Sequence, residues 1–192
     1  TGCKELFVGT ESENDRVLKY IGKETTKEKI IEKFEIISKF PIIKVFTNFI
    51  FGLPSHSINE IYESLSFIYE YTMKIRNLKI GVTPYLPLPG TQLFEVALKN
   101  GLQKPTSISY WSNFSSGKNG QFEKYKNFDW LNFKKKQIVF LNRIYYFMAY
   151  YNAVLPSNNS SLMFKIFTLP FLLSAKLRLK YKLFLFSDYE AN

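Results

Sequence analysis

The stretch that decides the fold runs from residue 42 to residue 55 and reads IIKVFTNFIFGLPS. Its first ten residues are mostly β-branched and aromatic, which favours a strand buried within a sheet. The segment Gly52–Pro54 then ends the strand and begins a loop. The helical pattern before the strand ends at Phe40-Pro41, because a residue that precedes proline avoids the helical region. After the loop, Ser57 or Asn59 can cap the next helix.

The same alternation of strand and helix continues in both directions from this stretch. Two further strands are predicted at Lys4–Val8 and Leu78–Tyr85. Apolar residues at helical spacing predict four helices. These helices are Asp15–Ile21, a helix that follows the capping pattern Thr25–Glu28 and ends at Phe40, Ile58–Ile75 and Gln92–Asn100.

An α/β fold with parallel strands follows from this order of elements, since strands that alternate with helices are joined by right-handed crossovers. In such folds the loops at the carboxyl ends of the strands carry the chemistry. Those loops are Gly9–Asn14, Gly52–Ser57 and Pro84–Thr91, and all three are rich in Gly, Pro and short polar residues. We therefore expect a ligand site where they meet.

The composition of the chain favours some classes of partner and excludes some kinds of site. The 26 Lys and Arg against 16 Asp and Glu give a net charge of +10, which favours anionic partners. A single cysteine, Cys3, excludes a disulfide framework and a zinc or iron–sulfur site built from this chain's own thiolates. A single histidine, His56, excludes a two-histidine metal site. We expect Cys3 to be a small buried filler and the chain, which begins Thr1-Gly2-Cys3, to be a piece of a longer protein.

Three regions differ in character along the chain. Residues 1–105 hold the strand–helix pattern, residues 106–126 form a polar loop, and residues 127–192 form a helical extension that is basic and aromatic. A long helix is predicted at Trp130–Tyr151. No segment resembles a secretory signal or reaches the roughly 20 apolar residues of a spanning helix. A cytoplasmic location is therefore expected, with peripheral membrane contact as an option.

The tail at residues 162–186 mixes Phe and Leu with Lys and Arg and contains Pro170, where a kink is expected. Two interpretations are open for this segment. It can lie on an anionic membrane surface as an interfacial helix. It can instead cover the open side of the barrel with its apolar face while its basic groups stay in water. Nucleic-acid binding ranks third, because no complete RNA-binding motif is present.

Three of these segments, taken in order, resemble signatures of the radical SAM enzymes. Gly9–Ser12, followed by Val17-Leu18 and Lys23, resembles the family's fourth-strand signature. Thr47–Pro54 looks like the fifth-strand signature, and Pro84–Thr91 is similar to the Pro-rich turn after the sixth strand. The resemblance covers residues 1–101. The subgroup most similar to this chain is that of the cobalamin-domain and methylthiotransferase-like radical SAM proteins.

The resemblance implies a partial TIM-like (βα)6 barrel of which this chain holds the second half, three βα units, followed by an α-helical C-terminal extension. The family's Cys-x3-Cys-x2-Cys motif and its glycine-glycine-acidic motif are absent from this sequence. The chain then resembles a fragment of an enzyme that cleaves S-adenosylmethionine (SAM) reductively with a 4Fe-4S cluster. The cluster ligands would lie in the missing N-terminal half of the same polypeptide. The subgroup also implies cobalamin-dependent methyl transfer as one outcome, on a small-molecule or lipid-like substrate.

Four SAM-binding residues are implied by the same resemblance. Glu11 matches a Glu or Gln that faces the ribose, and a carboxylate can accept hydrogen bonds from two vicinal hydroxyls. Asn48 matches a ribose-side position that is more often acidic. Ile50 and Gly52 match the segment under the adenine, where a glycine lets a flat ring approach the backbone. His56 replaces an acidic residue of the family pattern, and we expect it to be a solvated loop residue.

A second interpretation of the sequence, in which the chain is not part of an enzyme, also stays open. The chain can be a truncated protein that binds a membrane surface or another anionic partner through its basic aromatic tail. Glu11 would then only cap the short helix that follows it. In either case, half a barrel leaves the edge of the first strand unpaired and its apolar inner face uncovered. We therefore expect the isolated chain to aggregate or to fold loosely.

Overall fold

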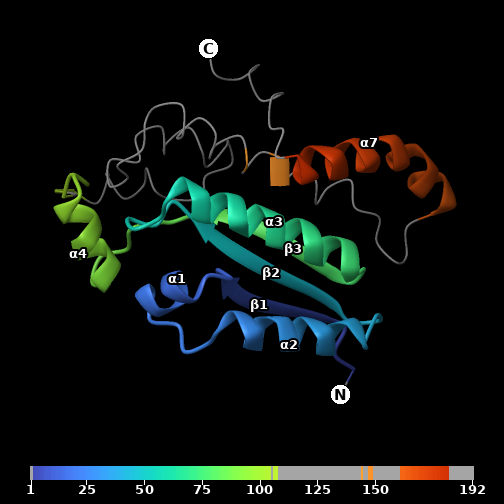
Figure 1. The fold of residues 1–192 in the computed structure, drawn as a ribbon, viewed down its shortest axis with the longest axis horizontal. Coiled ribbons are helices and arrows are strands. Elements are labelled where there is room, and N and C mark those ends of the chain that lie inside the picture. Colours follow the sequence, from blue (N-terminus) through green and yellow to red (C-terminus); the bar gives the residue numbers. More distant parts are fainter. Residues whose placement is uncertain (1, 105, 108–143, 145–146, 149–160, 182–192) are drawn as a thin grey trace, which may run out of the picture.

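The computed structural model describes residues 2–104, 106–107, 144, 147–148 and 161–181 (Figure 1). Strands and helices alternate over the first hundred residues, as the sequence predicts. The elements are β1 (Glu5–Glu11), α1 (Asp15–Tyr20), α2 (Lys27–Ser38), β2 (Lys44–Phe51), α3 (Ile58–Lys74), β3 (Leu78–Pro84), α4 (Gln92–Lys99) and α7 (Leu162–Lys180).

The three strands form one parallel sheet in the order β1-β2-β3. This confirms the α/β class and the parallel pairing. Three strands do not close a barrel, so the (βα)6 barrel stays a prediction. β1 runs three residues beyond its predicted end at Val8, because its pairing with β2 continues through a bulge to Glu11 opposite Phe49. The bulge brings Glu11 to the carboxyl edge of the sheet.

One face of the sheet packs against α2 and α3 and forms the core. Phe67 of α3 joins the layers, with its ring centre 6.1 Å from that of Phe34 on α2 and 6.1 Å from that of Phe49 on β2. All three rings are buried. The loop between α2 and β2 is fixed by the buried amide of Asn77, which donates to the carbonyl groups of Ile37, Phe40 and Ile43. The covered face of the sheet is therefore buried by aromatic packing, and the carbonyl groups of the loop beside it are hydrogen-bonded to Asn77.

The opposite face of the sheet is open. Phe7 and Phe46 are in register on this face, and their stacked rings lie 5.5 Å apart. The Lys79 ammonium lies over the Phe46 ring. Phe7 is 78% exposed and Phe46 is 36% exposed. Within the described part of the chain, β1 pairs only with β2. Among the residues that the structure places, the edge of β1 is thus unpaired and the inner face of the sheet is uncovered, as expected.

The N-termini of the helices are capped by short polar side chains. Ser57, not Asn59, caps α3, and its hydroxyl accepts a hydrogen bond from the Glu60 amide at 3.2 Å. The Glu60 carboxylate accepts in return from the Ser57 amide at 2.9 Å, which completes a capping box. Cys3 is exposed, so the prediction that it is a buried filler is wrong. It precedes an edge strand whose outer side nothing covers among the described residues.

α7 lies against α3, on the side of the sheet away from the open face (Figure 1). Pro170 lies inside this helix, and the kink expected there stays a prediction. Among the helices that the structure describes, none is both long enough and apolar enough to cross a bilayer. The predicted polar loop at 106–126 and the helix Trp130–Tyr151 lie largely outside the described residues. Of the latter, Ile144, Phe147 and Met148 are helical and buried.

Candidate functional site

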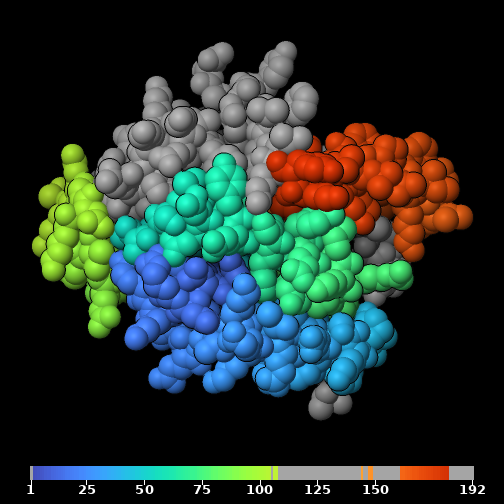
Figure 2. Space-filling model, viewed as in Figure 1, coloured from blue at the N-terminus to red at the C-terminus, as the bar shows by residue number. Residues whose placement is uncertain are grey.

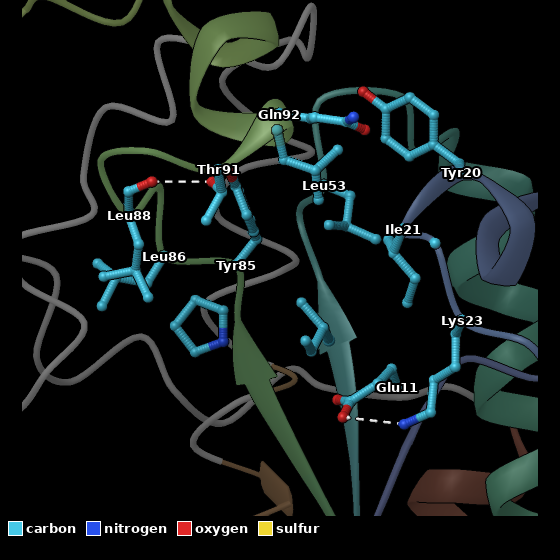
Figure 3. Close-up of a pocket in the computed structure, with 14 residues that line it drawn as sticks. Glu11, Tyr20, Ile21, Lys23, Leu53, Tyr85, Leu86, Leu88, Thr91 and Gln92 are labelled. Carbon is cyan, nitrogen blue, oxygen red and sulfur yellow. Dashed lines mark hydrogen bonds and ion pairs between the residues drawn. The ribbon is translucent and has the colours of Figure 1, made fainter.

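A cavity of about 630 Å³ opens at the carboxyl edge of the sheet (Figure 3). Its volume lies within the usual range of small-molecule sites, about 300–1,000 Å³. Side chains from the ends of all three strands and from the end of α1 line it, Glu11, Tyr20, Leu53, Tyr85 and Gln92 among them. The loops that the sequence marked as a ligand-lined rim therefore do meet around one cavity.

Glu11 holds an unusual backbone conformation at the edge of this cavity. Its φ is 65°, in the left-handed region that a residue with a Cβ rarely adopts. The carboxylate folds back over Gly9, so that a Cβ added at Gly9 would lie 2.2 Å from Glu11 Oε1. Backbone strain of this kind persists only where the surrounding structure enforces it, and it clusters at functional sites. Glu11 therefore stands out on geometry alone.

Lys23 holds the Glu11 carboxylate in place over Gly9. Its ammonium donates to the Gly9 carbonyl and lies 3.4 Å from Glu11 Oε1 (Figure 3). Lys23 follows the turn at Gly22, whose φ is 72°. One carboxylate oxygen is thus engaged by a cation while the carboxylate as a whole still lines the cavity. The pair can orient a polar group of a ligand.

The other walls of the cavity are largely apolar and aromatic. Burial raises the pKa of the Tyr85 phenol to about 12, against the smaller opposing effect of its hydrogen bond with Thr91. Tyr85 is therefore neutral at physiological pH. Thr91 also donates to the Leu88 carbonyl at 2.8 Å and accepts from the Phe94 amide, so it caps α4 and fixes the turn before it. Leu53 is fully buried behind the cavity. Such walls suit a flat, apolar ring.

The structure brings two of the four predicted site residues to the cavity, namely Glu11 and Ile50. Asn48 lies two residues before Ile50 on the same open face of β2 and donates to Thr83 Oγ1 at 2.7 Å. It is not among the residues that line the cavity. Gly52 is buried and has a φ of 82°, so it forms the turn that carries the chain out of β2. The roles assigned to all four residues stay predictions.

Asn48 lies in a row that is almost free of other side chains. In the sheet it is paired with Gly9 on β1 and with Gly81 on β3. A Cβ added at Gly81 would lie 3.0 Å from the Asn48 Oδ1 atom. The places that side chains at the two glycines would take are occupied instead by the Glu11 carboxylate over Gly9 and by the Asn48 amide beside Gly81.

His56 is buried, so the prediction that it is a solvated loop residue is wrong. Only 8% of its surface is exposed, and its ring meets that of Phe51 edge-on with centres 6.4 Å apart. Burial lowers its pKa to about 4 and keeps the imidazole neutral at pH 7. Its Nδ1 atom has no hydrogen-bond partner among the described residues. A turn in which the His56 amide donates to the Leu53 carbonyl at 2.9 Å precedes the ring, and its burial is not revealed by the sequence pattern.

An ion pair near His56 links the helices beside the site. The Arg16 guanidinium donates to the Glu60 carboxylate and, at 3.1 Å, to the Ser55 carbonyl. Burial would raise the pKa of Glu60, but hydrogen bonds from the Ser57 amide and from Arg16 outweigh it and lower the pKa. The pair therefore stays charged and ties α1 to the loop after β2.

Sequence reasoning missed three features of the site. Tyr20 and Lys23 line the cavity beside Glu11, a placement that was not predicted from their sequence pattern. The available signal was the short helix Asp15–Ile21 and the Gly22 that follows it, which return the chain to the sheet edge. Glu13 is also buried, and its carboxylate accepts from the Ser64 hydroxyl at 2.7 Å. Burial raises the pKa of Glu13 against the opposing effect of that hydrogen bond.

No group of three or more metal-binding side chains occurs in the described residues.

No family model matches the chain. It is 32% identical over 101 residues to an uncharacterised methyltransferase of Pyrococcus horikoshii, a stretch that is 53% of this chain and 21% of that protein.

Two further relatives have more specific names. The ribosomal protein uS12 methylthiotransferase RimO of Clostridium botulinum is 35% identical over 83 residues, 43% of this chain and 18% of its own length. The tRNA-2-methylthio-N(6)-dimethylallyladenosine synthase of Pelobacter propionicus is 31% identical over 96 residues, 50% of this chain and 21% of its own length. The chain thus spans about one fifth of the length of these relatives. Over about half of its own length it is similar to methyltransferase and methylthiotransferase enzymes.

Proposed function

We propose that this chain forms one wall of the SAM-binding site of a radical SAM enzyme. The observation that carries the proposal is the Glu11 carboxylate. It is held in a strained conformation by Lys23 at a cavity on the carboxyl edge of a parallel sheet. The similarity to methylthiotransferases supports the same assignment.

The described residues suit the nucleoside part of SAM. The Glu11 carboxylate can accept hydrogen bonds from the two ribose hydroxyls, with Lys23 restraining one of its oxygens. Ile50, Leu53 and the neutral phenol of Tyr85 offer apolar surface to the adenine ring. Asn48 lies further down the open face, where its amide donates to Thr83 Oγ1 at 2.7 Å. This assignment gives each residue a task that its chemistry allows.

The 4Fe-4S cluster would be held outside this chain. Among the described residues there is no set of ligands for it. When bound, a reduced cluster supplies the electron that cleaves a carbon–sulfur bond of SAM. The residues of this chain would orient the nucleoside and exclude water from it. The open face and the free edge of β1 would receive the N-terminal half of the same polypeptide.

Methyl or methylthio transfer is the outcome that the relatives' names favour. Methyl transfer through cobalamin is a narrower form of this proposal, and it is supported only by the subgroup that the sequence resembles. The substrate side of the site would include the rim of the cavity beyond Tyr20 and Gln92.

The proposal is tested first on the coding DNA upstream of the Thr1 codon. We expect a continuous reading frame that carries a Cys-x3-Cys-x2-Cys motif. The encoded polypeptide, reconstituted anaerobically with iron and sulfide and then reduced, is expected to release 5′-deoxyadenosine from SAM. Replacing Glu11 with Ala is expected to slow this release, whereas the exposed control Glu24→Ala leaves it unchanged. An authentic start codon next to Thr1 would contradict the proposal.

A further inference from the structure

α7 exposes large apolar residues on the side that faces away from the protein. Its buried residues, Ala175 and Leu179, lie on the side that packs against the rest of the chain. The opposite side carries a row of large aliphatic residues at spacings of three and four. We call this row the α7 ridge: Leu162, Ile166, Leu169, Leu173 and Leu177, which are 74%, 61%, 51%, 53% and 56% exposed.

The exposed apolar surface is wider than the ridge itself. Met163 and Phe167 extend it on one side and are 67% and 68% exposed. A pairing of two helices uses a narrow apolar seam, while a helix at a membrane surface buries a broad apolar face. Figure 2 shows α7, in red and orange, at the surface of the molecule. The breadth of the face favours a lipid phase over a single partner helix.

The charges on α7 indicate what kind of surface would cover the ridge. Lys165 and Lys176 lie along one border of the ridge and Lys180 lies within it, so the three lysines fall within about 60° of one another around the helix. The fourth basic residue, Arg178, lies on another side of the helix, with its guanidinium over the Phe147 ring. The helix contains no acidic residue. Two copies of α7 packed ridge to ridge would bring lysines together with no carboxylate of either helix to pair with them. A surface that supplies both apolar depth and negative charge fits better.

We propose that α7 lies in the surface of a bilayer that contains anionic lipid, with the α7 ridge among the acyl chains and the three lysines at the headgroups. Lysine side chains can extend from an apolar face to the headgroup level. α7 packs on α3, on the far side of the sheet from Phe7 and Phe46. Membrane contact therefore leaves the open face and the cavity free, and this inference does not depend on the proposed function.

The test is flotation of the full-length protein with vesicles of phosphatidylcholine, with and without phosphatidylglycerol. We expect binding to the anionic vesicles and little to the neutral ones. Each basic residue near an anionic surface changes binding about fivefold, so Lys165→Gln with Lys176→Gln and Lys180→Gln is expected to weaken binding about a hundredfold. The control Lys29→Gln with Lys39→Gln and Lys99→Gln removes the same charge from other helices and is expected to have a much smaller effect.

A second pair of variants tests the apolar contact separately. Ile166→Gln with Leu169→Gln replaces two exposed residues by good helix formers, so the fold is expected to persist. At high salt, where charge attraction is screened, this variant is expected to lose the remaining binding. The control Ile36→Gln with Ile42→Gln is expected to keep it. Absence of binding to anionic vesicles, or equal binding by the α7 variants, would overturn the proposal. So would a dimer that Ile166→Gln with Leu169→Gln dissolves, because the ridge would then join two copies.

Discussion

Glu11 combines two features that neighbouring strand residues do not share. Its backbone is left-handed at a φ of 65°, and its carboxylate is folded over a glycine. A side chain at Gly9 would occupy the place where Glu11 Oε1 now lies. Lys23 then holds the carboxylate against the Gly9 carbonyl group. At the scale of single residues, the position of the Glu11 carboxylate therefore depends on the absence of a side chain at Gly9 and on the ammonium group of Lys23.

The Gly9→Ala variant tests this dependence. The new methyl group is expected to displace the Glu11 carboxylate from its place beside Lys23, because 2.2 Å is far below any contact distance. Binding of S-adenosylhomocysteine to the full-length protein, measured by calorimetry, is expected to weaken at least tenfold. Gly81→Ala, on the same open face but 3.0 Å from Asn48, serves as the control and is expected to weaken it less. Equal binding by both variants and the unaltered protein would contradict the account.

His56 predicts a pH dependence of stability. Its pKa is about 4 in the folded protein and 6.5 in the unfolded chain, so the folded state holds fewer protons between these values. The stability that the neutral ring contributes is therefore present above pH 6.5 and is lost as the pH falls toward 4. The loss between pH 7 and pH 4.5 is about 2–3 kcal/mol.

Urea unfolding of the full-length protein at the two pH values measures this loss. The variant His56→Leu keeps an apolar side chain beside Phe51 and removes the titrating group. We expect it to lose about 2–3 kcal/mol less than the unaltered protein between pH 7 and pH 4.5. The same loss of unfolding free energy in both proteins would show that the pKa of His56 does not differ between the folded and unfolded states.

At the scale of elements, the loops at the carboxyl edge are held by helix caps. Ser57 caps α3 through a reciprocal pair of hydrogen bonds with Glu60. The Glu60 carboxylate also accepts a hydrogen bond from the guanidinium of Arg16 on α1. Thr91 caps α4 and fixes the turn that carries Tyr85 and Leu88 toward the cavity. The caps therefore both begin the helices and position the loops that line the site.

Ser57→Ala is expected to destabilise the protein by about 1 kcal/mol, because it removes one half of the capping box. Ser66→Ala is the matched control on the same helix. The Ser66 hydroxyl donates back to the Tyr62 carbonyl at 3.0 Å, a bond that does not favour the helix. We expect that control to be neutral or slightly stabilising in urea unfolding. A loss of equal size in both variants would show that the capping box contributes nothing.

Much of this element order could be predicted from the sequence, since apolar spacing, capping residues and glycine turns act locally. Lys44–Phe51 and Ile58–Lys74 lie close to their predicted bounds for that reason. The burial of His56 and the entry of Tyr20 and Lys23 into the cavity could not be predicted, because both depend on how separate loops fold over the sheet edge. Glu11 was predicted as a site residue, but its left-handed backbone was not, since no local pattern demands it.

At the scale of the whole molecule, the described helices cover one face of the sheet and leave the other exposed. α2 and α3 bury one face, while Phe7 and Phe46 remain exposed on the other. An exposed apolar face beside a free strand edge promotes association between chains. This arrangement is what half of a closed barrel would leave behind, and it predicts the behaviour of residues 1–192 when they are produced alone.

The isolated chain is expected to aggregate, and Phe7→Lys with Phe46→Lys is expected to raise its solubility severalfold. The control Ile36→Lys with Ile42→Lys adds the same charge at exposed apolar positions away from the open face. It is expected to have a smaller effect in sedimentation at matched concentration. A soluble monomer with a sharp cooperative melt would contradict this expectation.

The most direct test of the central claim is the affinity of the full-length protein for S-adenosylhomocysteine, measured by calorimetry with and without Glu11→Gln. The substitution keeps the size of the side chain and removes its charge. We expect at least a tenfold loss of affinity, since a hydrogen bond to a charged group contributes about 1.5–3 kcal/mol. The control Glu24→Gln is expected to bind like the unaltered protein. Unchanged affinity in Glu11→Gln would show that this carboxylate does not hold the ribose.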